Sequence, residues 1–264
     1  MPDYIKPLGF IVVRGIGAVI LFWLCHALLM REKVEKRDFP KLAICAVFGI
    51  AVNQMLFFSG LNITTTINAG IIMTSTPILV LIAAAFLVRE KINASKITGI
   101  ILGLAGAVLI IVMGKDFSFG SETLPGDLLI LINATSFGVF LVMVKPLMEK
   151  YHPLTVIKWV FLFGMLMVLP FGFRQFLAID WVNMPVNIWL AVAYVVVFLT
   201  FLSYLLNSYA LSRVSASTVS IYIYSQPVFA TIIAVILGND TLTPLKIIAA
   251  ALIFTGVYLV SWGK

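Results

Sequence analysis

Long apolar stretches alternate with short polar ones along the whole chain. A stretch of about 20 apolar residues is the length that crosses a bilayer as a helix. Lipid offers no partner to backbone polar groups, so such stretches must be helical, and the alternation of barrel strands is absent. The pattern predicts an all-α polytopic membrane helix bundle with spans at approximately 8–30, 41–59, 69–88, 95–114, 125–148, 153–173, 187–210, 214–237 and 244–262.

Composition agrees with this prediction. The 264 residues are 62% hydrophobic and 11% charged, whereas a soluble domain carries about 25% charged residues. The net charge of +7 falls between the apolar stretches, so we attribute it to basic cytoplasmic loops rather than to a nucleic-acid partner. The two cysteines have neither metal-ligand nor redox spacing, and we expect no metal and no cofactor.

Basic and non-basic loops alternate. Segment 31–41 holds five basic residues, segment 60–68 holds none, and segment 89–96 again holds three. Segment 116–127 is acidic, and basic charges return at Lys145, Lys150 and Lys158, which we count with the loops. The positive-inside rule then places the 31–41 loop and the C-terminus in the cytoplasm, with Met1 on the far side of the membrane. We expect that membrane to be the inner membrane of a bacterial cell.

A shift of 150 residues aligns one half of the sequence with the other without a gap. Proline, glycine and lysine positions coincide in this register: Ser75-Thr76-Pro77 with Ser225-Gln226-Pro227, Lys96 with Lys246, and Gly106 with Gly256. The basic residues of segment 89–91 have no basic counterparts in segment 239–241 of the second copy. Conversely, segment 60–68 has no charge, whereas its counterpart 210–218 contains Arg213. Such an exchange of charge indicates two copies inserted in opposite orientations.

The repeat divides the chain at residues 1–114 and 125–264. The first unit has four predicted spans and the second has five, although an inverted repeat needs an odd number in each copy. Segment 1–7 resembles segment 147–153, which follows the fifth span. We therefore expect a further helix, equivalent to 125–148, to be encoded upstream of Met1.

With these repeated features, the sequence resembles members of the drug/metabolite transporter superfamily, specifically permeases with two EamA domains. The resemblance covers essentially the whole chain and rests on the two proline-containing helices, on the junctions 88–91 and 238–240, and on Gly99, Gly103 and Gly106. It implies a ten-helix secondary carrier with five-plus-five inverted repeats. In such a carrier a central cavity opens alternately to either side.

Arg14 is the one charged residue that lies well inside a predicted span. Because a guanidinium in a membrane is costly, it indicates a functional site, here one that pairs a substrate carboxylate or phosphate. The alternative is that the side chain reaches the outer interface. All eleven acidic residues lie in loops or at helix ends, which argues against coupling through a membrane-embedded carboxylate and against intramembrane hydrolysis. His26 is interpreted as a hydrogen-bonded side chain near the cytoplasmic interface.

Uncharged polar residues recur at matching places in the two copies. Asn53 and Gln54 align with Ser203 and Tyr204, which favours a shared cavity over simple bonds to a neighbouring helix. The candidate substrate-binding residues are Arg14, Asn53, Gln54, Asn133, Trp159, Tyr204, Asn207, Tyr222 and Gln226, with helix kinks at Pro77 and Pro227.

The function that these features predict is alternating-access transport of small polar metabolites, amino acids or related compounds, in the direction of export. The alternative is a non-transporting scaffold or a subunit of a larger membrane assembly. A membrane enzyme would need acidic or histidine clusters that the sequence lacks. The expected partners are a small-molecule substrate and the bilayer, with the chain a monomer or homodimer.

Overall fold

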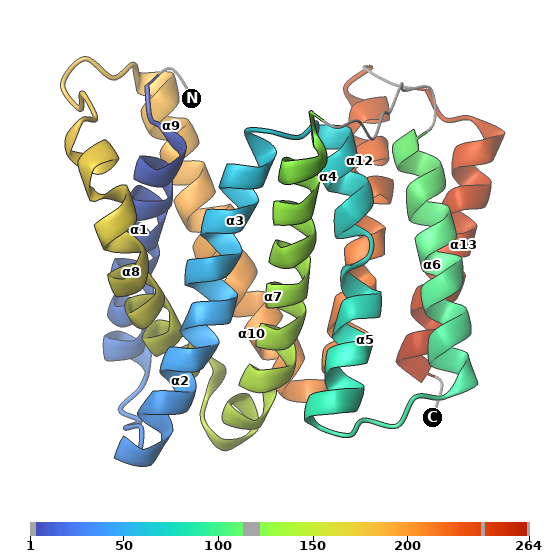
Figure 1. The fold of residues 1–264 in the computed structure, drawn as a ribbon, viewed down its shortest axis with the longest axis horizontal. Coiled ribbons are helices and arrows are strands. Elements are labelled where there is room, and N and C mark those ends of the chain that lie inside the picture. Colours follow the sequence, from blue (N-terminus) through green and yellow to red (C-terminus); the bar gives the residue numbers. More distant parts are fainter. Residues whose placement is uncertain (1–3, 113–121, 239–240, 263–264) are drawn as a thin grey trace. The chain divides into compact units, whose positions relative to one another are not determined.

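The computed structural model describes residues 4–112, 122–238 and 241–262, and their regular structure is helical throughout. Figure 1 shows the succession of helices. In chain order they are α1 (Pro7–Leu29), η1 (Lys36–Asp38), α2 (Phe39–Ala46), η2 (Val47–Ala51), α3 (Val52–Leu61), α4 (Thr66–Met73), α5 (Thr76–Leu87), α6 (Ala94–Val112), α7 (Leu124–Lys150), α8 (Pro153–Leu177), α9 (Val186–Tyr194), η3 (Val195–Leu202), α10 (Ser203–Arg213), α11 (Ala216–Ile221), η4 (Tyr222–Tyr224), α12 (Ser225–Ile236) and α13 (Pro244–Trp262).

Within the described residues, nine continuous helical stretches are long and apolar enough to cross a membrane. They fall on the nine predicted spans, and the last is identical to its prediction. The second begins at Lys36 rather than at 41, because η1 adds a 3-10 turn before α2. The all-α polytopic fold is thereby confirmed for the part of the chain that the structure describes. The predicted orientation placed the two chain ends, Met1 and Lys264, on opposite sides of the membrane. Both residues lie outside the described part of the chain, as does Asp116 of the predicted acidic segment.

The two copies of the repeat are built alike in detail. Thr65 and Ser215, which are 150 residues apart, begin α4 and α11 by accepting the backbone N–H three residues further on, each at 3.1 Å. Asn93 and Thr243 do the same before α6 and α13, at 2.8 and 3.4 Å. Such side-chain caps satisfy N–H groups that have no partner inside the helix. The shared caps explain why α6 and α13 begin at equivalent residues.

The spans that contain Pro77 and Pro227 are interrupted just before these prolines. The first breaks between α4 and α5, with Pro77 in the first turn of α5, and the second passes through the 3-10 segment η4 before Pro227 in α12. Proline cannot donate a backbone hydrogen bond, and its ring disfavours a continuous helix. At the first break the hydroxyls of Thr74, Ser75 and Thr76 donate to carbonyl oxygens three residues earlier, at 2.5, 2.7 and 2.7 Å. The bond from Thr76 satisfies the Met73 carbonyl, because the residue four positions later is Pro77, which has no N–H.

The chain forms two compact units, and each draws helices from both copies of the repeat. Unit 1 comprises Met1–Ser59 and Met143–Arg213, and unit 2 comprises Gly60–Val142 and Val214–Lys264. In unit 1, α1 packs along α8, and its core includes Val12, Ala51 and Val168. In unit 2, α6 packs along α13. The core there is formed by Leu81, Ile100, Ala107, Ile221, Tyr224, Val228, Ile253, Val257 and Val260.

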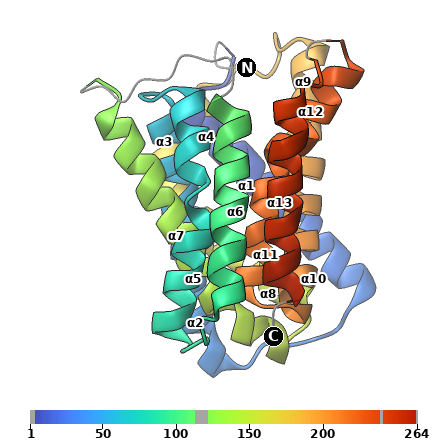
Figure 2. The same cartoon turned by 90° about the vertical axis from the view of Figure 1, so that its right-hand side faces the viewer.

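In unit 2 the equivalent helices α6 and α13 lie side by side and run in opposite directions (Figure 2). Gly99 near the start of α6 faces Gly256 late in α13, and Gly106 late in α6 faces Ala249 near the start of α13. Gly256 and Ala249 are the counterparts of Gly106 and Gly99 in the repeat, so each contact is the mirror of the other. Small residues allow the two backbones to approach closely. The repeat is therefore inverted in space, as the charge pattern predicts.

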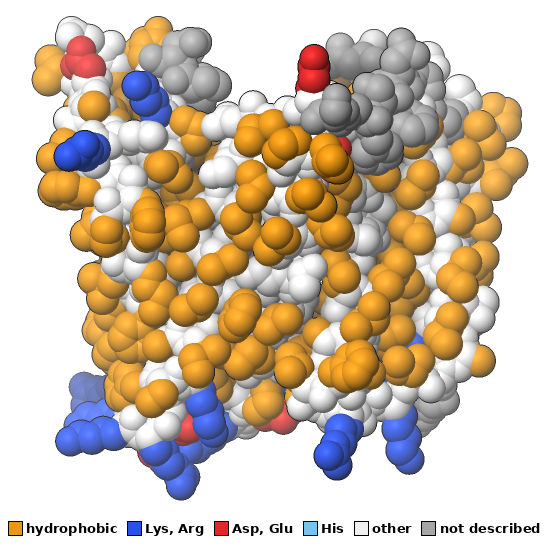
Figure 3. All heavy atoms as spheres, viewed as in Figure 1, with side chains coloured by type: hydrophobic (Ala, Val, Ile, Leu, Met, Phe, Trp, Pro, Cys, Tyr) orange, Lys and Arg blue, Asp and Glu red, His pale blue; other side chains and the backbone are white. Residues whose placement is uncertain are grey.

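Apolar side chains cover the sides of each unit (Figure 3). In unit 1, the loop that follows α1 carries exposed basic residues at one end of the helices. This loop contacts the turn between α7 and α8: the backbone N–H of Glu35 donates to Tyr151 at 3.1 Å, and Lys150 pairs with Asp38 at 2.6 Å. Two of the loops that their charges assign to the cytoplasm thus lie at the same end of this unit.

Candidate functional site

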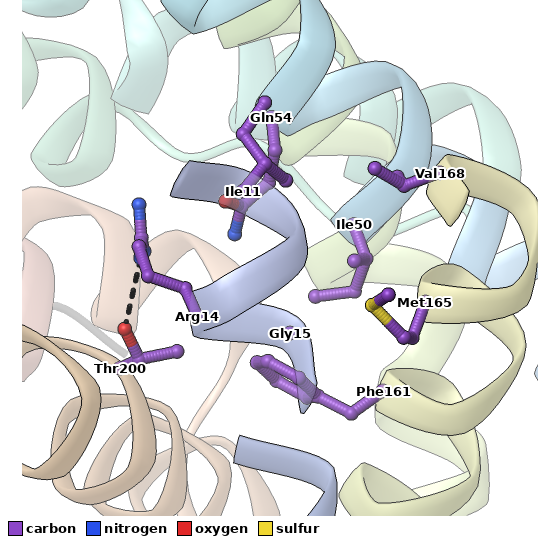
Figure 4. A pocket seen from close by; sticks show the side chains of 9 residues that line it. All are labelled: Ile11, Arg14, Gly15, Ile50, Gln54, Phe161, Met165, Val168 and Thr200. Atoms are coloured by element: carbon purple, nitrogen blue, oxygen red, sulfur yellow. Dashed lines mark hydrogen bonds between the residues drawn. The ribbon is translucent and has the colours of Figure 1, made fainter. Parts of the chain in front are cut away.

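A pocket opens inside unit 1 between helices of both sequence copies (Figure 4). Its empty volume is about 250 Å³, which includes open solvent. Excluding open solvent, it has room for roughly one water molecule, so a larger ligand fits only if the surrounding helices move. The lining residues are Ile11, Arg14, Gly15, Ile50, Gln54, Phe161, Met165, Val168 and Thr200. A mostly apolar wall with a few polar groups is typical of a small-molecule site.

Two π-helical segments contribute to this pocket. η2 supplies Ile50 and η3 supplies Thr200, two residues that are 150 positions apart in the repeat. One turn further on, Gln54 Nε2 donates to the hydroxyl of Tyr204 at 3.4 Å, and these residues are also counterparts. Side chains of the two copies meet their own equivalents only near the axis that relates the copies. The pocket therefore lies at the local symmetry axis, where inverted-repeat carriers bind their substrates.

Arg14 is anchored in this pocket by one hydrogen bond. Its Nε donates to Thr200 Oγ1 at 3.1 Å, and that hydroxyl donates in turn to the Val195 carbonyl at 2.9 Å, across the wide turn of η3. Figure 4 shows the Arg14 side chain leaving α1 on the side of Thr200. The guanidinium carbon also lies 5.8 and 5.5 Å from the ring centroids of Phe10 and Phe58, contacts that favour a cation.

The terminal nitrogens of Arg14 remain available. Among residues 4–112, 122–238 and 241–262, none forms an ion pair with Arg14, and none accepts a hydrogen bond from these nitrogens. A guanidinium presents paired N–H donors that match a carboxylate or phosphate. The Gln54 side chain, 6% exposed, lines the same pocket and is held through its Nε2. The arrangement can therefore bind an anionic group beside uncharged polar ones.

Of the nine candidate binding residues, Arg14, Gln54 and Tyr204 come together in unit 1. Asn53, next to Gln54, is half-buried and has a partner. Asn207 is exposed, and its side-chain amide donates to the Ser203 carbonyl of its own helix at 3.0 Å. Asn207 is therefore not part of the pocket lining in this conformation.

The other candidates lie elsewhere. Trp159 belongs to an aromatic cluster of unit 1, with its ring centroid 5.0 Å from that of Trp23 and 4.8 Å from that of Phe39. Three more belong to unit 2: Asn133 is buried in α7, whereas Tyr222 and Gln226 are exposed at the interruption before Pro227. No lining residue of the pocket in Figure 4 comes from this group.

Sequence reasoning missed several polar residues. Thr200 is a single hydroxyl in an apolar stretch, and only its contact with Arg14 marks it. Lys158 was counted among the loop charges, but it is 5% exposed inside α8, where its ammonium contacts His26 at 2.9 Å. Arg14 is therefore not the one charge inside a span. His26, in the last turn of α1, is 8% exposed and lies 3.2 Å from the Thr155 hydroxyl, so it is hydrogen-bonded as expected.

A buried carboxylate in unit 2 was also missed. Asp127 stands in the first turn of α7, as its predicted position at a helix end requires, but it is 6% exposed. Thr64 donates to one carboxylate oxygen, Thr123 donates to the other at 3.1 Å, and Asn68 lies at 3.4 Å. These bonds to neutral donors explain how a carboxylate is accommodated there.

Comparison with known proteins identifies the family. The model of the EamA-like transporter family matches residues 1–112 and 124–262. A transporter of Archaeoglobus fulgidus is 28% identical over 246 residues, covering 90% of this chain and 84% of the relative. The transporter YetK of Bacillus subtilis is 28% identical over 227 residues, covering 86% of this chain and 69% of YetK.

Two further similarities bear on substrate and fold. A protein of Streptantibioticus cattleyicolor named a probable terminal-alkyne amino-acid exporter is 23% identical over 230 residues, covering 87% of this chain and 75% of that protein. A crystal structure superimposes with a TM-score of 0.80 at 20% identity, covering 98% of this chain and 90% of the other. With nine membrane-spanning stretches among its described residues and this family match, the chain belongs to the EamA-like transporter family and is a multi-pass membrane transporter.

Proposed function

We propose that this transporter carries small metabolites that bear a carboxylate, amino acids or closely related compounds, outward across the bacterial inner membrane. The observation that supports this substrate class is Arg14, which lines the pocket in unit 1 and whose terminal nitrogens have no carboxylate partner among the described residues. A cation held in a membrane is costly unless it is paired. A substrate carboxylate supplies that pair and makes a charge-assisted hydrogen bond.

The remaining polar groups suit the rest of an amino acid. Gln54 and Tyr204 offer a side-chain carbonyl and a hydroxyl next to Arg14, and neither introduces a second charge. The similarity to an amino-acid exporter named in Streptantibioticus cattleyicolor supports the same substrate class. We propose a neutral or acidic amino acid over a lipophilic cation, because the positive charge of Arg14 repels cations.

Alternating access is the proposed mechanism. The pocket is lined by η2 and η3, whose π-helical turns have looser backbone bonding than an α-helix. The spans that contain Pro77 and Pro227 are interrupted in unit 2. Interrupted helices allow two halves of a span to tilt separately, as inverted-repeat carriers require. The contact between the 31–41 loop and the turn after α7 joins two basic segments at one end of unit 1, which supports the proposal that this end faces the cytoplasm. We propose that the C-terminus is also cytoplasmic.

Transport in proteoliposomes tests this proposal. We expect the protein, as a monomer or homodimer, to exchange tritium-labelled L-amino acids but not their decarboxylated amines. Arg14→Gln should reduce exchange by about 10- to 100-fold, since a hydrogen bond to a charged group contributes about 1.5–3 kcal/mol. The matched control is Arg174→Gln, at an exposed residue in the last turn of α8, and it should leave exchange unchanged.

Two results would contradict the proposal. Equal activity of the Arg14→Gln variant and the wild type would remove the role of the guanidinium in binding the carboxylate. Absence of exchange for every substrate would favour a scaffold or subunit role for the chain.

A further inference from the structure

A second cation of unit 1 is buried without a carboxylate partner. Lys158, on α8, is 5% exposed, and no described residue forms an ion pair with it. Its ammonium lies 4.8 and 5.6 Å from the ring centroids of Trp23 and Trp159, and 2.9 Å from Nδ1 of His26. Its surroundings are therefore two aromatic faces and one imidazole.

The geometry defines a chain of hydrogen bonds. An ammonium can only donate, so Nδ1 of His26 accepts from Lys158 and the hydrogen of the neutral ring is on Nε2. Nε2 lies 3.2 Å from the hydroxyl of Thr155, which is fully buried. Lys158 and His26 together hold one extra proton in this arrangement. A second would place two positive charges at hydrogen-bond distance in a buried site, which is strongly unfavourable.

Few other charges act on the pair. Glu32, in the loop after α1, interacts electrostatically with both Lys158 and His26, and His152, before α8, interacts with His26. The backbone N–H of His152 donates to Glu32 at 3.0 Å, and its ring lies 2.9 Å from the hydroxyl of Tyr209 on α10. From α2, the uncharged Phe39 packs on Trp159, one of the two rings beside Lys158. The pair thus lies just behind Glu32 and His152, close to the end of the helices that we assign to the cytoplasm.

We infer that Lys158 and His26 form the site that binds and releases the proton coupled to transport, an inference that rests on the proposed transport function. On release, an N–H bond of Lys158 breaks and its proton moves to Nδ1 of His26, while the proton on Nε2 leaves by way of Thr155 to cytoplasmic water. The product is a neutral lysine and a neutral imidazole, and no other bond changes. A carrier driven by a proton gradient needs such a group, and the acidic residues that the structure describes lie at the ends of spans or outside them.

The pair is placed to act on the substrate pocket. His26 follows Arg14 on α1 by 12 residues, or about 18 Å of helix. Between them, Phe22 of α1 packs on Phe161 of α8, with ring centroids 4.9 Å apart and both side chains buried. Phe161 also lines the pocket. Any shift of α1 along α8 that alters the contact between Lys158 and His26 therefore also alters the pocket wall.

Nuclear magnetic resonance tests the proton site without transport. The chain has only two histidines, so protein labelled with nitrogen-15 in histidine gives two sets of ring-nitrogen signals. The set that disappears in His152→Asn belongs to His152, and the other set belongs to His26. As the pH rises and the pair releases its proton, the hydrogen of the neutral His26 ring should move from Nε2 to Nδ1. Lys158→Met should abolish this change of tautomer, and Lys33→Met, at an exposed residue of the loop after α1, should leave it unchanged. A ring of His26 that does not respond to pH, or responds identically without Lys158, overturns the inference.

A flux experiment separates this inference from the proposed function. In proteoliposomes with tritium-labelled L-amino acids, the wild type should show both counterflow and accumulation driven by a pH gradient. His26→Gln and Lys158→Met should retain counterflow but lose the gradient-driven accumulation, and Lys158→Arg, which keeps the charge but cannot release a proton, should do the same. Wild-type counterflow combined with no response to the pH gradient overturns the proton site alone. Absence of counterflow in the wild type overturns the transport function and this inference with it.

Discussion

The Gln54 side-chain amide donates a hydrogen bond to the Tyr204 hydroxyl at 3.4 Å, and the two residues occupy the same position in the two copies of the repeat. A residue can touch its own counterpart only where an axis relates the two copies. One turn earlier, the counterparts Ile50 and Thr200 line the same pocket. The pocket that Arg14 lines therefore lies where the two copies of the repeat meet within unit 1, and this symmetry, rather than the size of the pocket, supports the proposal that substrate binds there.

The bond between Gln54 and Tyr204 should be measurable as an interaction energy. Tyr204→Phe is expected to lower the free energy of unfolding in detergent by about 0.5–1.5 kcal/mol, because it removes the accepting hydroxyl. Combined with Gln54→Leu, the two losses should not add, since each removes the same bond. Tyr258→Phe is the control, because Tyr258 is 60% exposed and its ring stacks on Trp262. Additive losses would mean that the two side chains do not interact in the folded protein.

The close packing of α6 and α13 predicts a sharp difference between glycines. A Cβ at Gly256 would overlap the carbonyl oxygen of Gly99, and backbone cannot move aside as a flexible side chain can. Gly256→Val should therefore destabilise the protein by about 1–3 kcal/mol or more, read from the unfolding midpoint in detergent. At Gly70 the nearest atoms belong to Ile111, at 3.8 Å, so Gly70→Ala should be neutral or stabilising by up to about 1 kcal/mol. Similar tolerance at both glycines would contradict the packing.

The ion pairs between the loop after α1 and the end of α7 predict a pH dependence of stability. The hydrogen bond from Lys150, at 2.8 Å, holds the pKa of Glu35 below its ordinary value, and Arg37 adds to this effect. A depressed pKa in the folded state contributes stability above the pKa of the unfolded state, about 4.3 for glutamate. That contribution is lost as the pH falls through the lower, folded-state value.

Lys150→Met should consequently lower the unfolding temperature at about pH 7, and the deficit should shrink as the pH falls below about 4. Lys33→Met serves as the control, because Lys33 forms no ion pair with any described residue. The measurement is the unfolding temperature of wild type and variants across the pH range. A deficit of constant size at every pH would show that Lys150 acts through packing and not through the carboxylates.

Local features of the sequence were enough to predict the spans. The first span was predicted at 8–30 and forms the helix Pro7–Leu29, and the last was predicted without error. Length and apolarity decide whether a segment crosses a membrane, and both belong to the segment itself. The start of the second span was predicted late, because η1 is held by Tyr151 and Lys150 bonding to Asp38 from another part of the chain.

The site was predicted only in part. Arg14, Gln54 and Tyr204 were found because they are polar residues in apolar stretches, two of them at equivalent positions. Lys158 was assigned to a loop, since a charge five residues from Pro153 looks solvated in the sequence. The structure buries it against His26 and Trp23, and such neighbours more than 100 residues away cannot be inferred from local pattern.

By itself, the sequence determined the number of spans in the described chain, the equivalence of its two copies and their opposite orientation. Each of these follows from hydropathy, charge and capping residues that act over a few turns. Only the tertiary structure decided that each compact unit takes helices from both copies, and which polar residues meet. The physical reason is that a helix in a bilayer is apolar on the faces toward lipid and toward protein alike, so hydropathy cannot tell which face packs against which neighbour.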